Sequence, residues 1–160
     1  MRSIWYLCML GLCGPVLAGG ALDPLAFLVG HCWEGEIHAG TDKHCYRWLY
    51  DEQFIIDEHV VYGDEPDYHG TTVYYYDNED ERIEFFYINS RGGVSTGYAD
   101  VREEGIVFPE KVVSGDDVRI VETVLQPDGA DAYRNIAREQ SVGGWKTWWE
   151  TTFQRLEESR

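Results

Sequence analysis

Cysteine and histidine crowd into one stretch of the chain, residues 27–50, which reads FLVGHCWEGEIHAGTDKHCYRWLY. It holds Cys32 and Cys45 together with three of the five histidines, His31, His38 and His44. Thiolate and imidazole are ligands that zinc prefers, and about four ligands must converge on one ion. The same two cysteines could instead form a disulfide with the histidines as bystanders.

Strand geometry and compartment both favour the disulfide between Cys32 and Cys45. Neighbouring residues of a strand point to opposite faces, so a histidine directly before each cysteine cannot easily reach the same ion. Disulfides also persist in oxidising compartments, which the start of the chain predicts. We therefore expect one disulfide and no bound metal. If Trp33 points inward, both cysteines point outward, and the inward residues of the second strand are His44, Tyr46, Trp48 and Tyr50.

The start of the chain, residues 1–18, reads as a secretory signal peptide. Arg2 precedes an apolar run over residues 3–13, and the small residues before and at Ala18 suit a signal peptidase. A membrane anchor is the alternative, but this run is short for a bilayer and Gly14-Pro15 interrupts it. We expect cleavage after Ala18, or after Gly20, and a periplasmic or secreted protein without stable membrane insertion.

The remainder, residues 21–157, predicts a single domain made almost entirely of strands. One short helix is expected at its start, with Asp23 as the cap and Gly30 at the end. Turn-forming clusters such as GDEPD, DNEDE and PDGAD separate segments rich in aromatic and β-branched residues. The expected strands are 33–38, 43–50, 53–62, 70–77, 82–90, 93–102, 105–109, 117–125, 131–140 and 144–155.

Ten short strands in sequence favour an antiparallel meander. A sheet of this length tends to close, because closure removes its exposed edges. The predicted fold class is therefore all-β, a single antiparallel up-and-down β-barrel of about ten strands. The formal net charge of −16 makes nucleic acid and anionic membranes poor partners. The oligomeric state does not follow from these patterns.

The stretch FLVGHCWEGEI, after the helix, is similar to the opening of calycin-type barrels, the lipocalin and fatty-acid-binding group. There a Gly and a Trp on the first strand close one barrel end; Gly30 and Trp33 hold those places, one residue further apart than usual. The ordered set GHCW, HCYRW, HVVYG, INSRGG, FPE, DGADAY and GW resembles a family of secreted bacterial proteins with a calycin-like barrel and no assigned activity. The resemblance covers nearly the whole chain after the leader and implies fold and compartment.

Nitrobindin, a more distant relative of this architecture, binds haem through a histidine late in its chain. The last histidine here is His69, so no later residue can supply that ligand. We expect no haem and no other cofactor.

The segment FIIDEHVVY carries the best remaining candidates for chemistry. Asp57 and His59 share one face of this strand, and a carboxylate beside an imidazole can orient it as a general base. His44 on the neighbouring strand would enlarge the cluster, and the three residues could also hold a divalent ion. A solvent-facing pair, or a buried pair that only satisfies itself, is the plain alternative.

Three further sites come from strand alternation. Arg134 and Arg138 share a face, which would bind a ligand carboxylate if it lay inside; an outward face that pairs with local acids is favoured. Asn89 is expected inward with Tyr87. In the last strand, one face is predicted to point inward; it comprises Trp145, Thr147, Trp149, Thr151 and Phe153.

The leading hypothesis is a barrel that binds a small hydrophobic or amphipathic molecule. The expected ligand-binding residues are His44, Tyr46, Trp48, Asp57, His59, Tyr87, Asn89 and Trp149. The first alternative is an isomerase or hydrolase of a hydrophobic substrate that uses His59, Asp57 and His44. The second is a barrel with a filled interior that acts through surface contacts with an envelope partner.

Overall fold

The computed structural model describes residues 20–63, 66–114 and 117–157, and the side chains of residues 112–117 are outside this description. The predicted signal peptide, residues 1–18, lies outside the described residues. Within the described part, no helix is long and apolar enough to cross a membrane.

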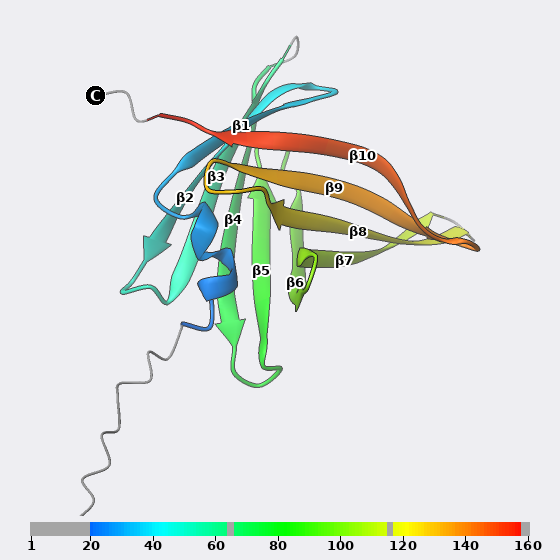
Figure 1. The fold of residues 1–160 in the computed structure, drawn as a ribbon, viewed down its shortest axis with the longest axis horizontal. Coiled ribbons are helices and arrows are strands. Elements are labelled where there is room, and N and C mark those ends of the chain that lie inside the picture. Colours follow the sequence, from blue (N-terminus) through cyan, green and yellow to red (C-terminus); the bar gives the residue numbers. More distant parts are fainter. Residues whose placement is uncertain (1–19, 64–65, 115–116, 158–160) are drawn as a thin grey trace, which may run out of the picture.

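Ten antiparallel strands follow one another around a closed barrel (Figure 1). Each strand pairs with its neighbours in sequence, and β1 closes the ring against β10 through Trp33 opposite Arg155 and Glu34 opposite Gln154. The strands are β1 Cys32–Ile37, β2 Gly40–Leu49, β3 Phe54–Tyr62, β4 Tyr68–Asp77, β5 Arg82–Asn89, β6 Val94–Arg102, β7 Gly105–Ser114, β8 Asp117–Pro127, β9 Ala132–Ser141 and β10 Gly144–Arg155.

The predicted all-β up-and-down barrel and its ten strands are confirmed, with one marked difference in length. The seventh strand was expected over residues 105–109, but β7 continues through Pro109 to Ser114. Its ladder with β6 comprises only three residue pairs and ends at Val107. Pro109 therefore has β8 as its only ladder partner, and an edge position tolerates proline.

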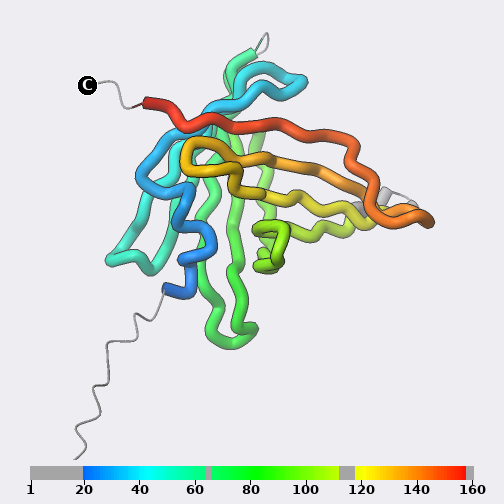
Figure 2. Tube along the Cα trace, viewed as in Figure 1, coloured from blue at the N-terminus to red at the C-terminus, as the bar shows by residue number. Residues whose placement is uncertain are grey.

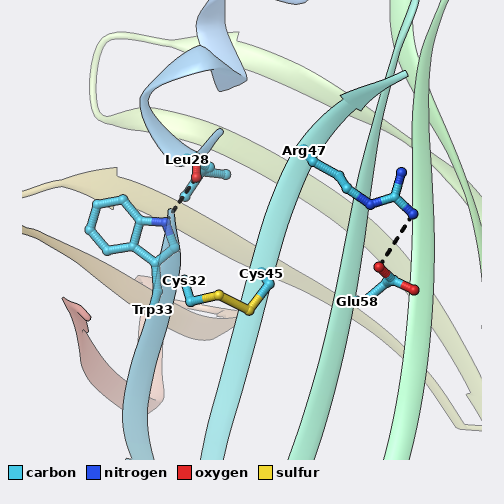
Figure 3. The surroundings of a disulfide bond; sticks show 6 residues. All are labelled: Leu28, Cys32, Trp33, Cys45, Arg47 and Glu58. Atoms are coloured by element: carbon cyan, nitrogen blue, oxygen red, sulfur yellow. Dashed lines mark hydrogen bonds and ion pairs between the residues drawn. A yellow bond between two sulfur atoms is a disulfide. The ribbon is translucent and has the colours of Figure 1, made fainter. Parts of the chain in front are cut away.

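A 3-10 helix, η1 (Asp23–Leu28), stands where the short helix was expected. The prediction that Asp23 caps it is wrong: Asp23 is the first helical residue, and the side chain of the capping residue, Leu22, makes no hydrogen bond. η1 buries Leu25 and Leu28 fully. Its last carbonyl, on Leu28, accepts a 3.0 Å hydrogen bond from the indole of the buried Trp33 (Figure 3). This bond attaches the helix to the first strand.

The disulfide joins Cys32 to Cys45, which face each other directly in the β1–β2 ladder (Figure 3). It lies on the outer face of the barrel, beside Arg47 and Glu58, while Trp33 points into the core. The predicted inward face of β2 holds for His44, Tyr46 and Trp48. It fails at Tyr50, which follows the end of β2, has a positive φ of 49° and is 77% exposed.

The strands form two groups that cross steeply (Figure 2): β7–β10 run across the direction of β3–β5. A β-bulge between Thr147 and Trp149 changes the phase of β10. Thr151 and Phe153 are buried inside as predicted, but Trp145 pairs with Gln140 on the outer face and is 41% exposed. The bulge adds one residue to the strand, so alternation could not be carried across it.

Candidate functional site

A cavity of about 840 Å³ occupies the barrel interior and opens to solvent. One part of its wall is aromatic and the other is polar and charged. The aromatic lining consists of Tyr46, Tyr74, Phe85, Tyr87, Tyr98, Phe108 and Tyr133. The charged lining residues are His44, Asp57, His59, Glu110 and Lys111.

The polar end of the cavity is built by two neighbouring strands, β2 and β3. His44 and His59 are direct cross-strand partners, and Asp57 lies opposite Tyr46. Asp42 precedes His44 by two residues and therefore points to the same side of β2. The outward disulfide at Cys45 is consistent with this phase. We call Asp42, His44, Asp57 and His59 the His/Asp cluster.

His44 lies between two carboxylates. Its Nδ1 is 2.8 Å from Asp57 Oδ2, and its Nε2 is 3.0 Å from Asp42 Oδ2. A carboxylate only accepts hydrogen bonds, so both ring nitrogens of His44 carry protons and the ring is an imidazolium. Neither nitrogen is left to act as a base.

The pKa values of His44 and Asp42 agree with this geometry. Burial lowers the pKa of His44, but the charge of Asp57 and the hydrogen bonds with both carboxylates outweigh it and raise the pKa from 6.5 to about 10. Burial raises the pKa of Asp42, but hydrogen bonds from His44 and His59 outweigh it and lower the pKa from 3.8 to about 2. Asp42 and His44 therefore form an ion pair at neutral pH.

His59 connects the cluster to two tyrosines. Its Nδ1 is 3.1 Å from Asp42 Oδ1, and its Nε2 is 3.3 Å from the Tyr87 hydroxyl, which in turn contacts the Tyr68 hydroxyl. Gly70 lies directly opposite His59 in the β3–β4 ladder. A Cβ atom at this position would overlap His59 Nε2, so the glycine leaves the space that the ring occupies.

Five of the eight expected ligand-binding residues line the cavity: His44, Tyr46, Asp57, His59 and Tyr87. The other three are placed elsewhere. Trp48 packs against the apolar core, and the Asn89 carboxamide accepts hydrogen bonds from the backbone N–H groups of Arg91 and Gly93 in a turn. Trp149 is half-buried on the inner face of β10, outside the cavity lining.

The expected partnership of Asp57 with His59 is wrong. Asp57 bonds His44, and Asp42 is the carboxylate that bonds His59. The sequence reasoning missed Asp42, although alternation from the outward Cys45 places it inward with His44. It also missed Tyr74, Phe108 and Tyr133. In a run such as TTVYYYD, which contains Tyr74, aromatic residues occupy both strand faces, so the run does not show which of them point inward.

Arg134 and Arg138 point outward, as the favoured interpretation predicts. Between them, Asn135 lines the cavity, so the two arginines lie on the opposite face of β9. Arg134 pairs with Glu150 at 3.2 Å, and Arg138 donates from Nε to the buried Glu122 at 2.6 Å. Neither guanidinium is available to a ligand inside.

The cavity opens sideways between β6 and β7. Four consecutive residues of each strand line it, 95–98 and 108–111, although consecutive strand residues point to opposite faces. Both faces can contribute only where the wall is interrupted. The β6–β7 ladder stops after Asp100 opposite Val107, and the strands then diverge (Figure 1). We call this opening the lateral slot.

Two groups among the described residues have metal-ligand atoms close together. Those of Asp42, His44 and His59 all lie within 4.8 Å of one another, but an ion there would have to replace the hydrogen bonds that join them. The second group is Asp77, Asp80 and Glu84 at the turn after β4, where Arg82 already pairs with Asp80 and Glu84.

No model of a protein family matches the chain, and no curated protein matches it in sequence.

Proposed function

We propose that this protein binds a small amphipathic molecule inside its barrel. The observation that carries the proposal is the open cavity of about 840 Å³. Ligand sites in proteins commonly have volumes of about 300–1,000 Å³ and combine apolar walls with a few convergent polar groups. Here the aromatic wall would hold the apolar part of the ligand, and the His/Asp cluster with Tyr87 would face its polar end.

The lateral slot supports this function because it supplies a route between solvent and the aromatic wall. The open interior favours ligand binding over the alternative of a filled barrel. The predicted secretion and the likeness to calycin-type barrels are compatible with a carrier, and both remain predictions. The disulfide is compatible with an oxidising compartment.

A cavity-filling variant tests the proposal. Thr123 lines the cavity from β8, whereas Thr152 is exposed on the outer face of β10. Binding of a neutral, solvatochromic apolar dye would be titrated into wild type, Thr123→Trp and Thr152→Trp. We expect saturable, one-to-one binding that Thr123→Trp weakens at least about tenfold and Thr152→Trp leaves unchanged. Equal binding by the two variants would place the dye on the surface and contradict the proposal.

One observation favours an acid–base enzyme as the second candidate. The His59 ring faces the cavity between the Asp42 carboxylate and the Tyr87 hydroxyl, so a carboxylate orients an imidazole at the edge of a ligand site. Both ring nitrogens of His44 already donate hydrogen bonds to carboxylates, so His44 cannot act as the base. Turnover of a panel of apolar aryl esters that His59→Gln abolishes, with dye binding intact, would establish this activity.

A further inference from the structure

The charges around the cavity select the polar end of the ligand. The His/Asp cluster contains two carboxylates, on Asp42 and Asp57, and both of them pair with one positive charge, the imidazolium of His44. With His59 neutral the cluster carries one net negative charge, and with His59 protonated it is neutral. In neither state does the inner end of the cavity have a surplus positive charge for an anion.

The other cations of the barrel do not change this balance. Among the described residues that line the cavity, the remaining cation is Lys111, which is exposed at the opening next to Glu110. Arg134 and Arg138 lie on the outer face in ion pairs. A carboxylate buried at the inner end would face Asp57 without a counter-ion, and such like-charge contacts cost several kcal/mol.

Two oxygen atoms at the cavity wall lack a hydrogen-bond donor in the described structure. Asp57 Oδ1 and Asn135 Oδ1 are buried and accept no hydrogen bond from any described residue, and both side chains belong to residues that line the cavity. The side chain of Asp57 is only 3% exposed. Buried acceptors without a donor are costly, so a ligand that brings N–H groups would be favoured over one that brings only acceptors.

Aromatic rings surround the same space. Tyr74, Phe85 and Phe108 form mutual ring contacts in the cavity wall, with centroids 5.8–6.4 Å apart. Tyr74 lies on β4, diagonally next to Asp57 of β3. The faces of such rings attract cations. The net charge of −16 also raises the concentration of cations near the protein.

From these charges, acceptors and rings we infer that the cavity takes a cationic amphiphile, an alkyl or aryl amine whose ammonium group lies toward Asp57, and discriminates against the matching carboxylate. This inference rests on the proposed binding function and specifies its ligand class. It is the opposite of the carboxylate ligand that Arg134 and Arg138 would bind if they lay inside the barrel.

Three ligands with the same chain test the inference: dodecylamine, dodecanol and dodecanoate, each below its aggregation concentration. Each would compete with the neutral dye for wild-type protein. We expect the amine to bind more tightly than the alcohol, and the carboxylate to bind most weakly, with the amine preferred over the carboxylate by roughly tenfold or more. Equal or tighter binding of the carboxylate, or of the alcohol relative to the amine, would overturn the inference while leaving the binding function standing.

Failure of the proposed function has a different signature, because then none of the three compounds displaces the dye in a saturable manner. The variants Asp57→Asn and Glu58→Gln separate the cavity charge from the charge of the whole protein. They remove one negative charge each from adjacent residues, but Glu58 points outward, where it pairs with Arg47. Asp57→Asn should reduce the ratio of the affinity for the amine to that for the carboxylate several-fold, and Glu58→Gln should leave this ratio unchanged. An equal reduction in both variants would contradict a specific site at Asp57.

Loss of the His44 partner could unfold Asp57→Asn, so Asn135→Leu provides an uncharged second test. This variant removes the other unpartnered acceptor while keeping a similar volume. Folding is checked by near-ultraviolet circular dichroism. In Asn135→Leu, the affinity for the amine should fall relative to the affinity for the alcohol. If this ratio of affinities is unchanged in folded Asn135→Leu and Asp57→Asn also has no effect, the two acceptors do not select the ligand.

Discussion

His44 Nδ1 on β2 lies 2.8 Å from Asp57 Oδ2 on the neighbouring strand β3, and the two residues are 13 positions apart in sequence. The β2–β3 register produces this contact: His44 pairs with His59, so Asp57, two residues before His59, is its diagonal neighbour. A second carboxylate, on Asp42, holds the other side of the ring. The imidazolium is thereby the central charge of the polar end of the cavity.

The first prediction concerns stability at alkaline pH. Because the folded state raises the pKa of His44 from 6.5 to about 10, this residue contributes stability that is fully present below pH 6.5 and is lost as the pH rises through about 10. Within that window the folded state binds one more proton than the unfolded state. The free energy of unfolding should therefore fall by up to about 1.4 kcal/mol per pH unit, measured by urea denaturation.

Two histidine variants provide the controls for this pH dependence. His44→Gln should lower the stability at neutral pH, because two buried carboxylates lose their shared partner, and it should remove the alkaline slope. His38 is exposed, so His38→Gln should retain the wild-type slope. A slope that persists unchanged in His44→Gln would assign the alkaline loss to another group.

The second prediction concerns the disulfide between Cys32 and Cys45. Closing a loop of about 15 residues stabilises a protein by roughly 3 kcal/mol in the chain-entropy model. The double variant Cys32→Ser/Cys45→Ser should lose stability of this order in urea titrations without a reductant. A thiol assay on unreduced, denatured protein produced without residues 1–18 should find neither cysteine free; two titratable thiols would show that the bond does not form.

The third prediction concerns Gly70, whose Cβ substituent would overlap the His59 ring and lie 2.7 Å from the Tyr87 hydroxyl. Because both groups are bonded to other members of the polar network, they cannot move without breaking hydrogen bonds. Gly70→Ala should cost roughly 1–3 kcal/mol in unfolding free energy and weaken dye binding. At Gly143 an added Cβ meets no atom within 4 Å, so Gly143→Ala should be close to neutral in both assays.

The fourth prediction concerns the lateral slot as the route of entry. Ser95 is exposed at its β6 edge. A bulky side chain there should hinder passage more than it changes the final bound state. Stopped-flow association of the dye should slow several-fold in Ser95→Trp, with a smaller change at equilibrium, while Thr152→Trp associates like wild type. An unaltered association rate would indicate that ligands enter elsewhere.

The order and number of strands could be predicted because they depend on local patterns. Turn-forming clusters separate short aromatic and β-branched runs, and each strand pairs with the next one along the chain. The predicted Cys32–Cys45 disulfide likewise follows from short-range reasoning, since both residues belong to one hairpin. Because the disulfide was expected on the outer face, His44 and Tyr46 were correctly predicted to point inward.

The candidate site was only partly predictable, because its contacts depend on register between strands. Asp57 and His59 were expected to pair since they share a strand face, yet cross-strand partners lie closer than residues two apart on one strand. The β10 bulge and the end of β2 placed Trp145 and Tyr50 outside, against simple alternation. Asn89 lies on the same strand face as Tyr87, as expected, but its carboxamide accepts hydrogen bonds from the following turn and does not line the cavity.

The sequence by itself determined a ten-stranded meander, one disulfide and an inward histidine beside aromatic residues, because alternation and turn chemistry act within a few residues. Only the tertiary structure decided that His44 is held between Asp42 and Asp57, that the arginines of β9 face outward, and that β6 and β7 part to open the interior. These features depend on the register and closure of the whole barrel. The contact between His44 and Asp57, for example, joins residues 13 positions apart through the register of β2 and β3.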